Sequence, residues 1–206
     1  MDYNTRQTLL IRIKDANNEA AWSEFVEIYT PLLYRFAERR GISASERADI
    51  IQETLRSVTG AIERFEHNQA VGSFRGWLYT VARSKIANHF RQQARRPQAI
   101  GGTTMAMKVQ EQPDPKDEVD WVKDYRQRLF EWAAQKVKQE FAENTWAAFW
   151  KTSVDDEEVS VVCETLEMSR GAVYVVKSRV VARIREKIAS VAGEWVEPDE
   201  FSESRS

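Results

Sequence analysis

Hydrophobic residues recur at intervals of three and four along most of this chain, which is the spacing of amphipathic helices. Three such stripes lie in the first half of the chain and four in the second. They span residues 19–41, 43–65, 74–95, 129–141, 145–151, 156–166 and 170–192. An all-α protein is therefore expected.

Two local signals refine the first two of these helices. Pro31 falls inside the first stripe, where it should kink or divide the helix, because proline has no amide hydrogen and its ring crowds the preceding turn. Ser43 and Glu46 have the spacing of a capping box, in which a hydroxyl and a carboxylate satisfy the unpaired amides at a helix start. The second helix is therefore predicted to begin at Ser43.

Glycine and proline are scarce, and their distribution indicates the domain organisation. The 206 residues contain 8 Gly and 5 Pro, about half the usual share, which disfavours collagen, low-complexity disorder and β-sandwiches with frequent turns. Residues 97–125 differ, because a Gly pair, prolines and acidic residues gather there and predict a flexible linker. We expect two small helical domains, at residues 1–96 and 126–192, followed by an acidic tail at residues 193–206.

Cysteine and histidine, which often form disulfides, metal sites and catalytic sites, are rare in this chain. Cys163 is the only cysteine, so no intrachain disulfide is possible, which fits a reducing compartment. One cysteine and two scattered histidines predict no zinc site, and neither a metal nor another cofactor is expected. The sequence motifs of a phosphate loop, a serine nucleophile elbow and a zinc-binding helix are missing, so we do not expect an enzyme.

The polar start of the chain predicts no signal peptide. A membrane-spanning helix needs about 20 apolar residues, whereas the longest apolar runs here span only a few residues. A cytoplasmic protein without a membrane span is therefore expected.

The formal net charge of −2 argues against a nucleic-acid partner when it is taken as an average. Along the chain, however, the charges are segregated. Residues 72–96 hold six basic residues and no acidic one, and residues 169–187 hold six basic residues and one acidic one. Residues 111–124 hold six acidic residues and two basic ones. Two basic helices on separate domains could bind a polyanion at two points. Each run alone also fits a solvated helix face.

The last two predicted helices have the pattern of a helix-turn-helix. Apolar residues on both sides of a tight turn are spaced to pack together: Val159, Val162, Leu166, Val173 and Val176. Ser169 is placed to cap the second helix, whose first residues enter the major groove in this motif. The residues expected on the exposed side are Arg170, Ala172, Tyr174, Lys177 and Arg179. An ordinary pair of antiparallel helices shares this pattern and stays open as an alternative.

Aromatic residues adjoin the basic helix of the first domain. Phe74 and Leu78 are expected in the core, whereas Trp77 or Tyr79 are candidates to stack on unpaired bases. The polar loop that begins at His67 could accept a flipped base. Aromatic residues at helical spacing are more often part of a core, so the two interpretations compete.

Motifs in both halves of the chain resemble one protein family. Segments of the first half are similar to region 2 of sigma-70-type RNA polymerase sigma factors: Asp49-Ile-Ile-Gln-Glu-Thr-Leu55, Phe65, Ser73-Phe-Arg-Gly-Trp-Leu-Tyr-Thr-Val-Ala-Arg83 and Asn88-His-Phe-Arg91. Segments of the second half resemble region 4: Met168-Ser-Arg-Gly-Ala-Val173 and Lys177-Ser-Arg-Val-Val-Ala-Arg-Ile-Arg-Glu186. Two such regions joined by a linker are typical of the extracytoplasmic-function (ECF) class.

The resemblance implies partners and a role for each region. Core RNA polymerase would be bound through the clamp coiled coil of β′ and through the β flap, and the linker would thread the polymerase cleft. The residues implied to dock on the clamp are Asp49, Gln52 and Glu53. Those implied to face the −10 element of promoter DNA are His67, Asn68, Trp77, Arg83, Lys85, Asn88, His89 and Arg91. Those implied to read the −35 element are Ser169, Arg170, Gly171, Ala172, Tyr174, Lys177 and Arg179.

One departure from the family pattern bears on promoter choice. A Lys-Ser-Arg-like triplet commonly follows Thr-Val directly in region 4, whereas this chain has Tyr174-Val-Val176 there and the triplet one turn later. An anti-sigma factor is a further partner that the resemblance allows.

An alternative function is a stand-alone helix-turn-helix regulator that binds DNA as a dimer at half-sites about one turn apart. The acidic residues from Asp49 to Glu53 have no purpose in such a regulator. Co-purification with core polymerase would separate the two functions.

Overall fold

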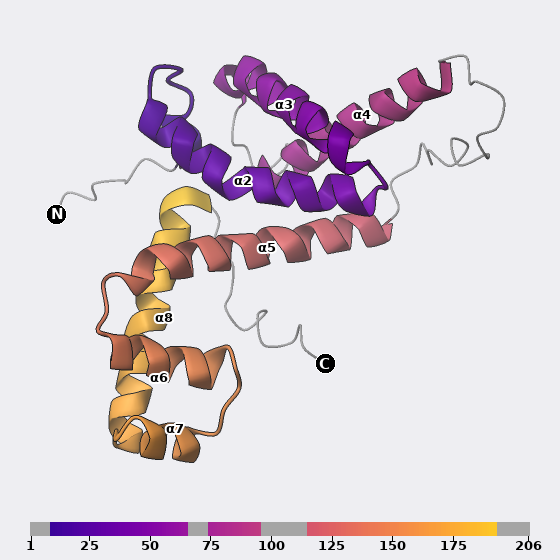
Figure 1. Ribbon diagram of the computed structural model, residues 1–206. Coiled ribbons are helices and arrows are strands. Elements are labelled where there is room, and N and C mark those ends of the chain that lie inside the picture. Colours follow the sequence, from indigo (N-terminus) through magenta and orange to yellow (C-terminus); the bar gives the residue numbers. More distant parts are fainter. Residues whose placement is uncertain (1–8, 66–73, 96–114, 193–206) are drawn as a thin grey trace. The chain divides into compact units, whose positions relative to one another are not determined.

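The computed structural model describes residues 9–65, 74–95 and 115–192. Within these ranges it contains eight α-helices, one 3-10 helix and no strand, which confirms the predicted all-α fold (Figure 1). The helices described there include none with the length and apolarity that a membrane crossing needs. His67 and Asn68 of the predicted base-capturing loop lie outside the described residues.

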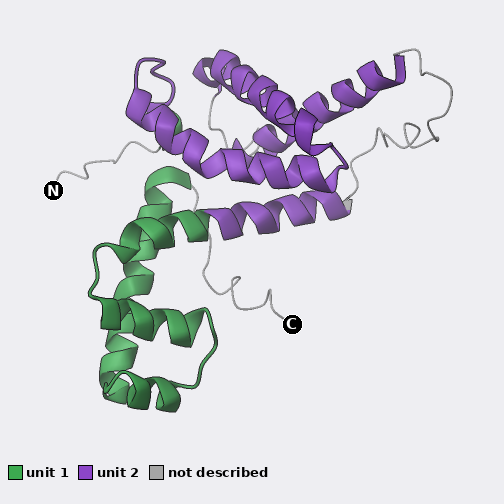
Figure 2. Cartoon of the chain, viewed as in Figure 1, with its two compact units in different colours: residues 1–10, 129–206 green, residues 11–128 purple. Residues whose placement is uncertain are grey.

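The chain divides into two compact units, which Figure 2 colours separately. Unit 2 comprises residues 11–128, and unit 1 comprises residues 1–10 together with 129–206. Both boundaries fall inside a helix, one in α1 (Leu9–Arg12) and one in α5 (Pro115–Lys138), so each of these helices supplies residues to both units. Each unit is described separately below.

Unit 2 is built from a small set of helices around an aromatic core. They are α1 (Leu9–Arg12), which begins in unit 1, α2 (Glu19–Arg39), α3 (Ala44–Ala61), the 3-10 helix η1 (Ile62–Arg64), α4 (Phe74–Arg95) and the first half of α5 (Pro115–Lys138). Helix α3 packs against both α2 and α4. Phe25 and Tyr29 of α2 meet Phe74 of α4, with ring centroids 5.9 and 5.5 Å apart, respectively. These contacts place the start of α4 in the core, as predicted.

The two local signals have separate outcomes. Helix α2 runs through Pro31 without being divided, so of the two effects predicted for this proline, the division does not occur. Burial of the apolar side of the helix on both sides of Pro31 offsets the lost hydrogen bond. The Ser43 hydroxyl bonds to the Glu46 carboxylate instead of to a helix amide. The helix still begins at the predicted place, but the capping box does not form because Glu46 is also held by α4.

The C-terminal part of the predicted linker is helical. Helix α5 begins at Pro115, so residues 115–125 are not flexible chain as expected. Proline suits the first turn of a helix because its missing amide hydrogen would have no partner there. Asp117 and Glu118 in that turn favour the helix dipole. Trp121 and Tyr125 then give the helix an apolar side, and both are buried.

Hydrogen bonds and ion pairs hold the first half of α5 within unit 2. The indole nitrogen of Trp121 donates to the carbonyl oxygen of Arg75 at 3.2 Å. The Arg128 guanidinium donates to two carbonyl oxygens of α2, those of Glu27 at 2.8 Å and Ile28 at 3.3 Å. Asp124, buried apart from 8% of its surface, pairs with Arg39 at 2.5 Å.

Unit 1 contains the second half of α5 and three further helices. These are α6 (Glu143–Ser153), α7 (Val159–Thr165) and α8 (Arg170–Ala192), and both α6 and α7 pack on α8. Val162 of α7 is buried with Val173 and Val176 of α8, and Val159 and Leu166 pack against them. The packing predicted across the turn is therefore confirmed.

The turn between α7 and α8 has a defined backbone. Glu167 adopts a left-handed conformation with φ 53°, and the amide of Met168 donates back to the carbonyl oxygen of Cys163 at 2.9 Å. This pattern is a Schellman motif, which satisfies the last carbonyls of a helix. The Ser169 hydroxyl accepts from the Ala172 amide at 3.2 Å, which confirms Ser169 as the N-cap of α8.

Candidate nucleic-acid interface

The predicted docking residues form one exposed acidic and polar face on α3. Asp49, Gln52 and Glu53 are all exposed, and they lie within little more than one turn of the helix. The opposite side of α3 is anchored by buried Ile50 and Thr54, and the Thr54 hydroxyl donates to the Ile50 carbonyl oxygen at 2.8 Å. The helix therefore presents the two carboxylates of Asp49 and Glu53 to solvent from a fixed position.

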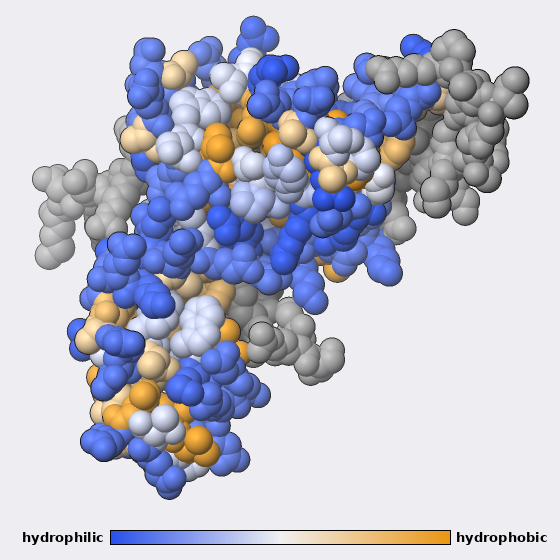
Figure 3. Space-filling model, in the orientation of Figure 1, coloured by the Kyte–Doolittle hydropathy of each residue, from blue (hydrophilic) through white to orange (hydrophobic). Residues whose placement is uncertain are grey.

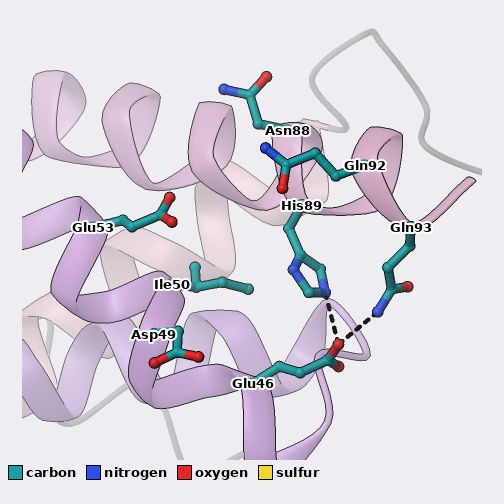
Figure 4. Close-up of a pocket in the computed structure, with 8 residues that line it drawn as sticks. All are labelled: Glu46, Asp49, Ile50, Glu53, Asn88, His89, Gln92 and Gln93. Atoms are coloured by element: carbon teal, nitrogen blue, oxygen red, sulfur yellow. Dashed lines mark hydrogen bonds and ion pairs between the residues drawn. The ribbon is translucent and has the colours of Figure 1, made fainter. Parts of the chain in front are cut away.

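A groove between α3 and α4 joins two sets of predicted site residues. It is lined on α3 by Glu46, Asp49, Ile50 and Glu53, and on α4 by Asn88, His89, Gln92 and Gln93 (Figure 4). Two residues predicted to bind the polymerase, Asp49 and Glu53, thus lie beside two predicted to face DNA. Sequence spacing could not show this, because Asp49 and Asn88 are about 40 residues apart along the chain.

Glu46 fixes the second half of α4 against α3. Its carboxylate accepts from the Gln93 side-chain amide at 2.7 Å, and the His89 Nε2 atom lies 3.5 Å from it. Figure 4 shows both side chains turned toward Glu46. The His89 side chain keeps only 19% of its surface exposed, so it is engaged inside unit 2.

Helix α4 presents a basic surface on the side away from the core. Leu78, Ala82 and Ile86 form its buried stripe, and Arg91 is exposed on the outer side. The other predicted DNA-facing residues of this helix are half-buried: Trp77, Arg83, Lys85, Asn88 and His89. Since α4 has no acidic residue, nothing on the helix itself offsets its attraction for phosphate.

The two aromatic candidates for base stacking occupy different environments. Tyr79 is buried against Phe36 and Trp121, so the prediction that it could stack on a base is wrong. Burial is also the main cause that raises the pKa of its hydroxyl. Trp77 contacts Phe65 and Phe74, with ring centroids 5.2 and 5.4 Å away, and stays half-buried.

Helix α8 places most of the residues predicted for −35 recognition in solvent. Val173, Val176 and Val180 face the core of unit 1. The exposed predicted residues are Ser169, Arg170, Gly171, Tyr174 and Arg179, whereas Ala172 and Lys177 are half-buried. The N-terminal part of α8 therefore carries cationic side chains at its surface.

Basic residues in the later part of this run are already engaged within unit 1. Arg183 bonds to Glu140 and to Glu186. The hydrogen bond from Arg183 is the largest cause that lowers the pKa of the Glu140 carboxyl. Lys187 lies over the Trp132 ring, 4.8 Å from its centroid. The cations best placed for a polyanion are thus those nearer the start of α8.

In the α7–α8 pair, two valines are exposed that were not predicted as surface residues. Val175 of α8 is 58% exposed and Val161 of α7 is 49% exposed. Valine at helical spacing indicates a core position, so the hydrophobic pattern could not single them out. Figure 3 shows apolar surface over the end of unit 1 that carries α7 and the start of α8.

Residues 25–96 match the family model described as sigma-70 region 2. The match runs from the first turns of α2 to the end of α4, and it includes the acidic face of α3. No curated protein matches the chain. Within the described residues, no three histidine, cysteine, aspartate or glutamate side chains are grouped so that they could hold a metal ion.

Proposed function

We propose that this chain, which carries a sigma-70 region 2 domain, is an ECF-class sigma factor. The match over residues 25–96 supports a sigma-70 family sigma factor with a role in transcription initiation. Members of that family are non-enzymatic and work with core RNA polymerase and promoter DNA. The match carries the proposal because the same segment contains an exposed acidic face on α3 and a basic surface on α4.

The acidic face of α3 is proposed to dock on the clamp coiled coil of β′. Asp49 and Glu53 are four residues apart, so both carboxylates point in the same direction from the helix. Gln52 beside them accepts a hydrogen bond from Arg56 at 3.2 Å. Exposed carboxylates at this spacing suit a basic helical partner, and their attraction increases the rate of encounter.

The outer surface of α4 is proposed to face the −10 element. Arg83, Lys85, Asn88 and Arg91 would contact the backbone and bases, and Trp77 would adjoin an unstacked base. Extrusion of a base costs a few kcal/mol, and each stacking contact returns about 1–3 kcal/mol. His67 and Asn68 are proposed to receive the flipped base. His89, which is turned toward Glu46, contributes mainly by fixing α4.

Unit 1 is proposed to recognise the −35 element through α8. The α7–α8 pair has the short turn and N-cap of a helix-turn-helix, in which the second helix enters the major groove. The residues proposed to contact DNA are Ser169, Arg170, Gly171, Ala172, Tyr174, Lys177 and Arg179. The β flap and an anti-sigma factor are proposed as further partners of the chain.

Reconstitution with core RNA polymerase tests this function. The protein should co-purify with core polymerase and direct transcription from specific promoters. Asp49→Arg combined with Glu53→Arg should abolish co-purification, because both docking carboxylates are reversed. Glu63→Arg with Glu118→Arg is the matched control, since both are exposed acids of unit 2 outside this face. Wild-type protein that fails to bind core polymerase would instead indicate a stand-alone DNA-binding regulator.

A further inference from the structure

The centre of the outward face of α8 carries no charge. Gly171, Val175 and Ser178 follow one another at intervals of four and three residues, so they share one side of the helix. All three are exposed, and Val175 keeps 58% of its surface in solvent. Tyr174 beside it is 55% exposed.

Cationic residues flank this uncharged stripe. Arg170 and Arg179 are exposed on either side of it, and Lys177 is half-buried. The first acidic residue of α8 is Glu186, four turns from its start. An uncharged stripe between cations suits an anionic partner that offers apolar groups between its charges. A DNA major groove has this chemistry, because phosphates border base edges that carry methyl groups.

The fold does not require a glycine at position 171. A Cβ atom added to it would meet nothing within 4 Å, and its φ does not lie in the left-handed region. Glycine also weakens a helix relative to alanine. Its absent side chain does allow close approach of a partner to the helix backbone, one turn before the exposed Val175.

We propose that Val175 reads a thymine methyl group in the −35 element, with Gly171 allowing the helix to approach the base edge. This inference rests on the proposed function of α8. The 5-methyl of thymine is the apolar group on the base edges of the major groove, so it is the natural contact for a valine there. Tyr174 supplies a second apolar surface beside it. Val175 thus determines specificity where the chain departs from the common family pattern.

The test uses the full chain bound to core RNA polymerase. A −35 element is first selected from a randomised promoter library, and each of its thymines is then replaced by deoxyuridine, which removes only the methyl group. Loss of the contacted methyl should weaken promoter binding by about fourfold, the effect of exposing one CH2-sized group. Val175→Ser should abolish that sensitivity at the same position. Val161→Ser, a matched change at an exposed valine of α7, should retain it.

The outcomes separate this inference from the function on which it rests. Promoter-specific transcription in which no thymine methyl matters, or in which Val175→Ser keeps the full deoxyuridine effect, would overturn the inference alone. Val175→Ser with unchanged promoter choice and reduced binding of a protein partner would assign the stripe to that partner instead. Holoenzyme without any promoter preference would overturn the proposed function as well.

Discussion

Glu167 shows how much one residue determines in the turn between α7 and α8. Its φ of 53° lies in the left-handed region, which costs a residue with a side chain about 1–2 kcal/mol. The hydrophobic pattern predicts the turn but not this conformation, because a glutamate gives no signal for it. The packing of α7 on α8 around Val162 and Val173 offsets the free-energy cost of this backbone conformation.

Glu167→Gly is expected to stabilise the protein by about 0.5–1 kcal/mol. Glycine adopts the left-handed conformation without steric cost, and this gain exceeds its entropy loss of about 0.5–1 kcal/mol on folding. Urea unfolding followed by circular dichroism measures the change. Glu164→Gly, in the helical part of α7, should instead destabilise by about 1 kcal/mol; the same effect at both positions would contradict the prediction.

The Arg183–Glu140 pair predicts a pH dependence of stability in unit 1. Because Arg183 lowers the pKa of Glu140 in the folded protein, the pair stabilises the fold above the unfolded pKa. That contribution is lost as the pH falls through the lower, folded pKa. Thermal unfolding from about pH 7 to about pH 3 should show that Arg183→Gln is less stable than the wild type at neutral pH, and that this difference in stability shrinks on acidification. The difference should be small, since both side chains are well exposed. For the control Arg179→Gln, the difference in stability from the wild type should not shrink as the pH falls.

At the scale of elements, the sequence predicts helices well where their ends are marked. The pattern over residues 74–95 and 170–192 matches α4 and α8 at both ends. The start of α5 was missed because proline and acidic residues mark both linkers and helix N-termini. What decides between these outcomes is the burial of Trp121 and Tyr125 against unit 2, and a tertiary contact of this kind leaves no local pattern.

Trp121→Ala is expected to lower the free energy of unfolding by about 3–5 kcal/mol, because a fully buried tryptophan leaves a large cavity. The residue is 1% exposed and packs against Phe36 and Tyr79. Val119→Ala, at a position of the same helix that is 66% exposed, should change stability by less than about 0.5 kcal/mol. Equal effects of the two substitutions in urea unfolding would show that α5 does not pack as described.

At the scale of the whole molecule, the net charge of −2 hides opposite local charges. The acidic face of α3 and the basic surface of α4 lie in one unit and share a groove. This neighbourhood could not be predicted, since it depends on how α3 and α4 pack. The basic character of α4, in contrast, followed from its composition, whereas the acidic face of α3 was implied only by the family resemblance.

Salt dependence of promoter binding should separate cations that contact DNA from those used within the fold. Each phosphate contact contributes about −0.9 to the slope of log affinity against log salt. For the protein bound to core polymerase, Arg170→Gln should therefore make the slope shallower by about 0.9. Arg183→Gln removes the same charge from α8, but Arg183 pairs with Glu140 and Glu186, so it should leave the slope unchanged. An equal loss of slope in both variants would contradict this assignment.

Helix α5, which the two units share, has a practical consequence for dissecting this protein. A fragment that stops at residue 96, where the family match ends, would lack the half of α5 that covers Phe36 and Tyr79. The two aromatic rings would then belong to an exposed hydrophobic patch, so such a fragment should self-associate. A cut after Arg128, the last residue of unit 2, keeps Trp121 and Tyr125 in place and is the better excision point for a soluble piece.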